Sequence, residues 1–435
     1  MKNTFKVFGI IALVAIIGFS FAACSDGGGG NDGGNSGNNG EPVVPPGPDA
    51  TSLSISPTSD TIKLGETLKP TITIKPSDAP IINWVSNDTD VATVGSDGTI
   101  SSKRIGKAIV TVTAKGGKTA TCTINVEPDV TKVANFNFDL DFKAIVYGDG
   151  RFVASRRDGK IAWSDNGIDW TEADSKFTNT DDIVSIIYDI AYGNGVFVVV
   201  GCETLPGQAW NISGYKLVYS DTRGTSWTIG TTDKSGQGSF STVTFGNNIF
   251  LAGGSGGLII SSQDGKTWKT AATDWGNSNR SAENLAYGNN KFIATGEYGN
   301  IAYSSDNGAN WTILDTEKRP FGNSSVKNIV FGNGKFVAIC DDLLNTVAYS
   351  TDGENWTAVT SQPVPFFANS PKCITYGDGI FIGGGSFKFE YSRDGISWSR
   401  RTVLDEGSYA WVVIGNGMFL GNYGKTLIYA PVVLK

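Results

Sequence analysis

The side chains that most often carry out chemistry are unevenly represented in this chain of 435 residues. Histidine is absent, which excludes a Ser-His-Asp triad, a Cys-His pair, an H-E-x-x-H zinc site and any histidine general base. Beyond the N-terminal segment the cysteines are Cys122, Cys202, Cys340 and Cys373, and none of them has C-x-x-C spacing. We therefore expect no metal site, no cofactor and small buried cysteines. A Cys340–Cys373 disulfide stays open, because sequence alone does not define its geometry.

Charge and composition narrow the classes of protein further. The net charge is -7 with a pI near 4.9, and 18% of the residues are charged. Nucleic-acid binding needs clustered Lys and Arg, so we expect no nucleic-acid partner. The chain has 56 Gly, 11 Trp and a 40% hydrophobic fraction, which is enough for packed cores. These values predict an all-β protein of two or three domains.

The first residues have the features of a secretory signal. Two lysines and an apolar run over residues 7–19 precede Ala22, Ala23 and Cys24. The run is too short for a well-flanked membrane span. Residues 1–23 resemble a bacterial lipoprotein signal, which implies that Cys24 is acylated and becomes the mature N-terminus. An ordinary secretory signal with an incidental cysteine is the alternative.

The segment after Cys24 has the composition of a tether. Residues 24–50 are rich in Gly and Asn and then in Pro, and such a segment cannot bury a core. The Gly-rich part predicts flexibility and the Pro-rich part a stiffer spacer. A lipid followed by a tether predicts a body held off a membrane surface, in the cell envelope at the outer membrane or cell surface.

Residues 51–128 alternate between apolar and polar side chains, with turn signals between the short runs. Six or seven short strands in this length predict a small β-sandwich, with Trp84 as its central core residue. The runs SISP, LGET, WVSND, VATV and DGTI resemble a group 2 bacterial immunoglobulin-like domain. The resemblance implies a stalk or adhesion module. We interpret it as a spacer, with direct ligand contact as the alternative.

One unit recurs throughout residues 130–435. Its first turn has the pattern Gly-Asn-Gly or a close variant, which accepts the positive φ of a tight hairpin. A phenylalanine follows two residues later at the same strand position. The seven copies of the turn are residues 147–150, 192–195, 245–248, 287–290, 331–334, 376–379 and 414–417.

A second turn recurs in six copies and ends in tryptophan, at Trp170, Trp227, Trp268, Trp311, Trp356 and Trp398. These turns resemble the Asp-box, S-x-D-x-G-x-x-W, of sialidase-type (BNR) propeller repeats. The mechanics of such a turn are structural: the Asp or Asn side chain bonds backbone N–H groups, glycine supplies positive φ, and tryptophan packs against the strands. We therefore expect these tryptophans in the core and no catalytic or calcium role for the Asp residues.

The spacing of the two turns predicts a β-propeller. Successive box tryptophans are 57, 41, 43, 45 and 42 residues apart, which is typical of four-stranded blades. Seven first turns predict seven blades, with six or eight as the alternative. The last unit has three strands and no box, so its fourth strand is expected from residues 132–138, which would close the ring and remove free edges.

The alternating strand directions predict where a ligand binds. The two kinds of repeated turn share one face, and the variable loops, among them a long one over residues 202–215, lie on the other. Aromatic faces stack on sugar rings, and Arg pairs with carboxylates. The candidate ligand-binding residues on the variable face are Arg156, Arg157, Trp210, Trp275, Arg280, Arg319, Phe366 and Tyr409.

The sialidase resemblance also bears on catalysis. Sialidases use an Arg triad, a Tyr–Glu pair and an Asp acid/base, together with an F-R-I-P signature that is missing from this chain. We assign no catalytic residue and expect a monomeric, lipid-anchored envelope protein whose propeller binds a glycan or a surface protein. The alternatives are an exo-acting glycoside hydrolase, whose two carboxylates would have no sequence spacing, and an assembly scaffold like propellers of the photosystem assembly-factor type.

Overall fold

The computed structural model describes residues 45–133, 142–156, 158–177, 184–205, 208–275, 281–340, 346–360, 371–385, 388–402, 411–423 and 426–432. The predicted signal segment, Cys24 and most of the tether lie outside these ranges. Within the described ranges the elements are strands and three short 3₁₀ turns, and none is a helix long and apolar enough to cross a membrane. The predicted all-β class is confirmed.

Residues 52–127 form the predicted sandwich of short strands. Three sheets have the orders β1-β4, β2-β9-β8-β5 and β3-β7-β6. Inward and outward side chains alternate along β8, where Ala108, Val110 and Val112 are fully buried, as period-two patterning requires. The strands are β1 (Ser52–Ser56), β2 (Ser59–Lys63), β3 (Thr67–Leu68), β4 (Thr71–Lys75), β5 (Ile81–Ser86), β6 (Ala92–Val94), β7 (Ile100–Ser102), β8 (Gly106–Ala114) and β9 (Thr119–Glu127).

The prediction that Trp84 occupies the centre of this core is wrong. Trp84 is only partly buried and packs against the outside of an aliphatic core that contains Val91 and Ile124. Its ring lies over Gly98, where a Cβ would come within 2.7 Å of a ring carbon. Aliphatic side chains already fill the interior, so the larger indole covers the edge of the core.

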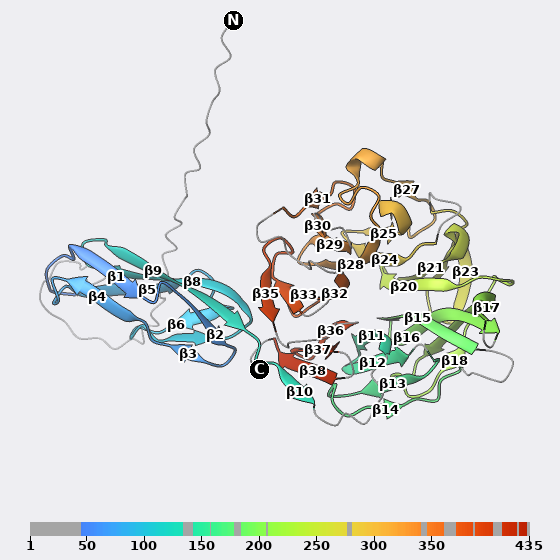
Figure 1. Cartoon of the computed structure of the whole chain (residues 1–435), viewed down its shortest axis with the longest axis horizontal. Coiled ribbons are helices and arrows are strands. Elements are labelled where there is room, and N and C mark those ends of the chain that lie inside the picture. The colour runs from blue at the N-terminus through green and yellow to red at the C-terminus, as the bar shows by residue number, and fades with distance from the viewer. Residues whose placement is uncertain are drawn as a thin grey trace, which may run out of the picture. The chain divides into compact units, whose positions relative to one another are not determined.

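From residue 131 onward, the described strands form seven sheets of four or five strands, which we number as blades 1 to 7. In blades 1, 2, 4, 5 and 6 the strands follow one another in sequence from the centre outward, and blade 3 repeats this order for four strands and carries a fifth, which precedes them in sequence, at its outer edge. Figure 1 shows the first strands around the centre of the ring. The strands of blades 1 to 3 are β11 (Phe142–Gly148), β12 (Arg151–Arg156), β13 (Ile161–Ser164), β14 (Thr171–Glu172); β15 (Val184–Gly193), β16 (Val196–Leu205), β17 (Gln208–Ser220), β18 (Thr228–Ile229); β20 (Phe240–Gly246), β21 (Ile249–Gly254), β22 (Ile259–Ser262), β23 (Thr267–Ala272) and the outer β19 (Thr231–Thr232).

The remaining blades repeat this plan. Their strands are β24 (Asn284–Gly288), β25 (Lys291–Thr295), β26 (Ile301–Ser304), β27 (Thr312–Ile313); β28 (Val326–Gly332), β29 (Lys335–Cys340), β30 (Val347–Ser350), β31 (Thr357–Ala358); β32 (Pro371–Gly377), β33 (Ile380–Gly385), β34 (Lys388–Ser392), β35 (Ser399–Thr402); β36 (Val412–Gly415), β37 (Met418–Tyr423), β38 (Thr426–Pro431) and β10 (Thr131–Val133). Three short 3₁₀ turns connect strands: η1 (Ser255–Gly257), η2 (Glu297–Gly299) and η3 (Thr316–Lys318).

The two ends of the repeat region meet in blade 7. Strand β10 pairs antiparallel with β38, so that Lys132 lies opposite Ile428. The predicted closing strand, residues 132–138, overlaps β10, and its remainder lies outside the described residues. The first strands of blades 7 and 1, β36 and β11, are also in contact. The ring is therefore closed both at its rim and at its centre.

The glycine of each first turn permits close contact between neighbouring blades. A Cβ on Gly246 of blade 3 would lie 2.0 Å from Cγ of Tyr287 in the first strand of blade 4. Only a residue without a side chain leaves room for that ring. The same contact recurs around the ring, between Gly148 and Tyr192, Gly193 and Phe245, Gly288 and Phe331, Gly332 and Tyr376, Gly377 and Ile414, and Gly415 and Tyr147.

Each aromatic ring that covers a turn glycine also packs on the phenylalanine of its own second strand. The ring centroids of Tyr287 and Phe292 are 4.7 Å apart and the planes are tilted by 49°, an arrangement that aromatic pairs favour. Corresponding pairs in five other blades have centroid distances of 4.6–4.8 Å. A layer of glycine and aromatic contacts therefore runs through the interfaces between blades.

The box turns have the structural role that their residue types predict. In blade 3, Asp264 Oδ1 accepts hydrogen bonds from the backbone N–H groups of Lys266 and Thr267, both at 2.9 Å. In all six boxes the indole N–H donates to the carbonyl oxygen of the box glycine, at 2.9–3.2 Å. Trp227 and Trp268 are fully buried, and the other four box tryptophans are partly buried.

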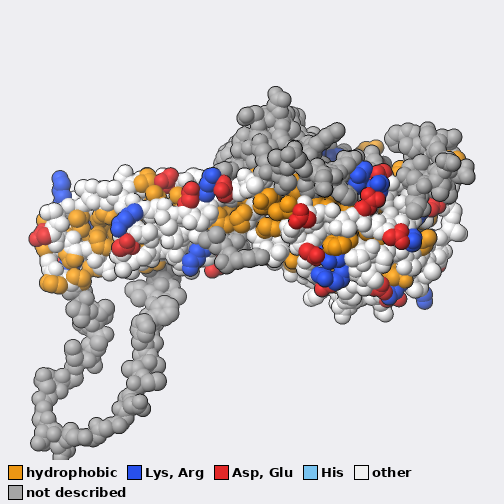
Figure 2. Space-filling model, turned by 90° about the horizontal axis from the view of Figure 1, so that it is seen from below, with side chains coloured by type: hydrophobic (Ala, Val, Ile, Leu, Met, Phe, Trp, Pro, Cys, Tyr) orange, Lys and Arg blue, Asp and Glu red, His pale blue; other side chains and the backbone are white. Residues whose placement is uncertain are grey.

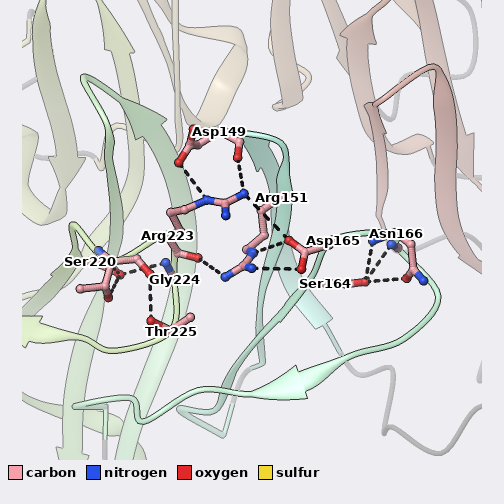
Figure 3. Close-up of polar contacts among 11 residues, drawn as sticks. Asp149, Arg151, Ser164, Asp165, Asn166, Ser220, Arg223, Gly224 and Thr225 are labelled. Atoms are coloured by element: carbon pink, nitrogen blue, oxygen red, sulfur yellow. Dashed lines mark hydrogen bonds and ion pairs between the residues drawn. The ribbon is translucent and has the colours of Figure 1, made fainter.

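The two kinds of repeated turn lie together and bind each other across blade boundaries. Figure 3 shows Arg151 of blade 1 between Asp165 of its own box and the backbone of blade 2. The Arg151 guanidinium pairs with both carboxylate oxygens of Asp165, at 2.7 and 3.0 Å, and donates to the carbonyl oxygen of Arg223 at 3.2 Å. Arg223 in turn pairs with Asp149 in the first turn of blade 1, at 3.0 Å. This face therefore uses its polar side chains to join blades.

The glycine contact yields a direct test of the blade interface. Gly246→Ala should lower the free energy of unfolding by about 3 kcal/mol, because the added methyl group overlaps the Tyr287 ring. Gly195→Ala is the matched control: that glycine has φ +79° but no atom within 4 Å of an added Cβ, so the cost should be only about 1 kcal/mol of backbone strain. Urea denaturation measures both. Equal losses in the two variants would contradict the steric account.

Candidate binding site in the central channel

The first strands carry a repeated irregularity near their start. In five of them the pairing with the second strand skips one residue, which is the mark of a β-bulge. The skipped residue always lies five positions before the turn glycine, and blade 4 has Glu283 at that position, just before β24. A bulge changes the direction in which a side chain points. The bulged residues are Lys143, Tyr188, Ser241, Lys327 and Lys372.

All five bulged residues and Glu283 line one cavity of about 360 Å³. The cavity lies at the start of the first strands, which is the end of the channel where the connections between blades enter. A second cavity of about 320 Å³ continues toward the repeated turns and shares Asp189, Asn284, Asn328 and Thr375 with the first. Volumes of roughly 300–1,000 Å³ are typical of small-molecule sites.

Charge is distributed unevenly around this cavity. Lys327, Lys372 and Lys143 come from blades 5, 6 and 1, and all three are exposed. These residues form what we call the lysine arc, which spans blade 7 and its buried Trp411. Tyr188, Ser241 and Glu283 come from blades 2, 3 and 4 and form the opposite arc. The cavity therefore has one cationic wall and one wall of hydroxyl and carboxyl groups.

Asp189 ties the first strands of blades 2 and 3 together beneath the opposite arc. Its Oδ2 accepts hydrogen bonds from Thr242 Oγ1 at 3.0 Å and from the Val243 N–H at 2.9 Å, and its Oδ1 accepts one from the Ile190 N–H at 2.8 Å. Burial raises the pKa of Asp189 to about 6, although these hydrogen bonds and Lys143 favour the charged form. The carboxyl oxygens are thus occupied by the protein itself.

Glu283 lies on the opposite arc without such a cage of donors. Burial raises its pKa, and repulsion from the neighbouring carboxylate of Glu297 acts in the same direction, while attraction to Lys327 partly offsets both. Asp189 and Glu283 therefore both bind protons more tightly than ordinary carboxyl groups. Raised pKa values of this kind are common at functional sites and are also found in structural networks.

Trp275 was predicted to contact ligand, and this prediction is wrong. Its side chain is fully buried in the core shared by blades 3 and 4. A Cβ on Gly296 would lie 3.0 Å from the Trp275 ring, so the indole packs against the backbone there. Trp275 packs there among Leu251, Leu285 and Phe292, and this burial keeps the indole from the surface.

Arg156 and Arg319 lie at loops, where they bind groups of the protein. The Arg156 guanidinium donates to Asp158 Oδ2 at 2.8 Å within its own turn. Arg319 donates to the carbonyl oxygens of Leu314 at 3.2 Å and Tyr298 at 3.4 Å, and thereby fastens the η3 turn to η2. Both arginines have a structural role in this state, and neither lines the cavity as described.

The other candidates are only partly described. Arg157, Arg280, Phe366 and Tyr409 lie outside the described residues. Trp210 lies in β17, and its side chain is likewise outside the description. The prediction of a long loop over residues 202–215 is wrong. Strands β16 and β17 continue to pair in this region, with Cys202 opposite Tyr215. Strands β16 and β17 are therefore longer than the second and third strands of the other blades.

The cysteines do not pair. Cys122, Cys202, Cys340 and Cys373 are buried free thiols, so the possible Cys340–Cys373 disulfide is not formed. Burial raises the pKa of the Cys373 thiol to about 12, which makes it a poor nucleophile. Within the described ranges, no cluster of three or more Asp, Glu or Cys side chains could hold a metal ion.

Tyr298 was missed by the sequence analysis. It lies in η2, between the second and third strands of blade 4, and 52% of its surface is exposed. The neighbouring Glu297 acts on Glu283 at the cavity wall, and η2 contacts β28. Tyr298 has φ 57°, whereas the equivalent position in blade 3 is Gly256 with φ 68°. Aligning the repeats at these two turns would have revealed a tyrosine where the fold prefers glycine.

The raised pKa of Asp189 predicts a specific dependence of stability on pH. Between pH 3.8 and about 6 the folded chain keeps the Asp189 proton that the unfolded chain has lost, so stability falls as pH rises through this range. Relative to Asp189→Asn, the free energy of unfolding of the parent should fall by about 2 kcal/mol between pH 4 and 7. Urea denaturation at both pH values measures the difference. A constant difference across this range would contradict the burial of the carboxyl group.

Two family models match parts of the chain. Residues 49–124 match the model described as Bacterial Ig-like domain (group 2), in agreement with the resemblance of the sandwich. Residues 211–406 match the model described as DUF6242 beta propeller domain. A search of curated proteins found no match to the chain.

Solved structures resemble the chain in fold. "YCF48 bound to D1 peptide" matches with a TM-score of 0.52 and 12% identity, over 71% of this chain and 97% of that chain. YCF48 from Cyanidioschyzon merolae matches with a TM-score of 0.48 and 12% identity, over 69% of this chain and 98% of that chain. The WD40 propeller domain of Doa1 matches with a TM-score of 0.49 and 13% identity, over 69% of this chain and 95% of that chain. At these identities the likeness concerns fold alone. The chain thus contains a group 2 bacterial Ig-like domain followed by a β-propeller domain.

Proposed function

We propose that this protein is a lipid-anchored binding protein of the cell envelope, and that its propeller recognises a glycan at the central cavity. The observation that carries the proposal is the pairing of a polar cavity with an exposed tyrosine, Tyr298, held in a conformation that costs stability.

The conformation of Tyr298 supports a role in binding. A non-glycine residue in the left-handed region costs about 1–2 kcal/mol, and such strain is concentrated at functional sites. Blade 3 avoids the cost with Gly256 at the same place in its turn. The bonds from Arg319 to this turn hold the strained backbone in place. An exposed aromatic ring kept at such a cost, on a turn whose Glu297 acts on the cavity residue Glu283, is suited to stacking on a sugar ring.

The lining of the cavity favours a glycan over an apolar ligand. Amide and hydroxyl groups of Asn284, Asn328, Ser241 and Thr375 line it, and such groups pair with the hydroxyl groups of a sugar. Across the side of the molecule seen in Figure 2, Lys and Arg are interspersed with Asp and Glu and form no extended patch of one sign. A surface protein is the alternative ligand for the same face.

Tyr298→Gly separates binding from folding. The free energy of unfolding of the variant should be about 1 kcal/mol higher than that of the parent, because the strain is relieved. The variant should bind the preferred saccharide of a glycan array at least tenfold more weakly than the parent does. Tyr298→Phe keeps the ring and should retain both the strain and the binding. If Tyr298→Gly binds saccharide as tightly as the parent, or if the parent binds no saccharide at all, the proposal fails.

The anchor is tested by the chemistry of the mature N-terminus. Mass spectrometry of the protein purified from membranes should find an N-terminal peptide that begins at Cys24 and carries acyl chains, with residues 1–23 removed. The peptide that contains Cys122, which is buried, should be unmodified. An N-terminal peptide that is unacylated, or that begins elsewhere, would rule out the lipid anchor.

A second candidate function is favoured by the two carboxyl groups of the cavity. Asp189 and Glu283 come from different blades, line the same space and have raised pKa values, as a glycoside hydrolase requires of at least its acid. The described lining contains no arginine for a sialidase-type triad. Because the Asp189 oxygens already accept three hydrogen bonds, we favour binding. Turnover of aryl glycosides that disappears in Glu283→Gln would reverse this choice.

A further inference from the structure

We infer that the lysine arc binds a carboxylate group of the glycan, so that the preferred ligand is an acidic saccharide. The inference rests on the proposed function, since it names the chemistry of the same cavity. It assigns the ammonium groups of Lys143, Lys327 and Lys372 to the acidic group and the opposite arc to sugar hydroxyls. No bond is broken or formed in this binding.

The first support is the placement of the three lysines. Each is a bulged residue, so its side chain points out of the strand pairing and lines the channel. All three are exposed, so they contribute little to the packing of the blades. In a chain of net charge -7, three lysines from three blades at one structural position form a local cationic wall.

The second support is the charge balance inside the cavity. Three ammonium groups face two carboxyl groups, those of Asp189 and Glu283, which leaves the wall net positive with both acids ionised. Lys143 acts on Asp189, and Lys327 acts on Glu283. Because Asp189 is already held by three hydrogen bonds, an anion entering the cavity competes with it little for the lysines.

The third support is the complementarity of the opposite arc. Ser241 carries a hydroxyl group, and Glu283 accepts hydrogen bonds when it is ionised. The Tyr188 hydroxyl accepts a hydrogen bond from the buried Cys202 thiol at 3.9 Å and keeps its own proton to donate. An acidic sugar presents a carboxylate on one side of its ring and hydroxyl groups on the other. Lysine acts as a compact point charge on a flexible stem, so three of them accommodate a carboxylate without requiring the fixed fork geometry of arginine. The two walls of the cavity therefore match the two sides of such a ring.

The test compares each acidic saccharide with a neutral partner of the same shape. The full chain in detergent is titrated calorimetrically with oligogalacturonate and with its methyl ester, and sulfated saccharides form a separate arm. The carboxylate form of the best-binding uronic or sialylated saccharide from the array should bind at least tenfold more tightly than its ester. Raising the salt concentration should reduce this preference.

The variants assign the preference to the arc. Lys143→Gln, Lys327→Gln and Lys372→Gln combined should weaken binding of the acidic form about 100-fold and leave the ester unchanged. The matched control combines Lys69→Gln, Lys103→Gln and Lys118→Gln, which removes the same charge from exposed positions of the Ig-like domain and should have little effect.

The outcomes separate this inference from the function on which it rests. The lysine arc alone is overturned if saccharide binding needs Tyr298 but shows no preference for the carboxylate. It is also overturned if the triple variant keeps the preference for the carboxylate. A preference for sulfate over carboxylate also overturns it. Binding of an oligoglutamate peptide through the same lysines, with no saccharide bound, overturns both and assigns the cavity to a protein partner.

Discussion

The contact between a turn glycine and the side chain of the following blade is the constraint on which the rest of the propeller depends. It brings the first strands close enough to form a channel, and it recurs from Gly148 to Gly415, where the last blade meets Tyr147 of the first. Because each ring also packs on a phenylalanine of its own blade, neighbouring blades share one aromatic layer. Polar bonds among the turns, such as those of Arg151, reinforce this layer on one face.

Because these contacts lie at the face of the repeated turns, the opposite end of the channel is available for binding. Side chains of the repeated turns form hydrogen bonds with neighbouring turns. At the starts of the first strands, by contrast, bulged residues line the channel. A ring of closed blades is rigid, so residues at one repeated position are held in fixed relation although they are far apart in sequence. Lys143 and Lys372 are 229 positions apart in the chain and yet line one cavity.

Much of the fold could be predicted from the sequence, because its determinants are local. The first turns need residues that adopt positive φ, and the box turns need a side chain that accepts hydrogen bonds from nearby backbone N–H groups. Both requirements leave a visible pattern in the sequence. The residues of the proposed binding site could not be found in this way. A bulge does not show in an alternating strand pattern, and Trp275 looks like a loop residue until the chain folds it into the core. The lysine arc exists only because the closed ring brings one position of three blades to the same cavity.

The central claim is that the cavity lined by the lysine arc is where this protein meets its ligand. A crystal structure of the protein with its best-binding acidic saccharide tests this most directly. The account predicts one sugar ring inside the channel, with its carboxylate within about 3 Å of a lysine ammonium group and the next ring on Tyr298. A saccharide bound to the face of the box turns, or to the Ig-like domain, with the channel filled by solvent, would contradict it.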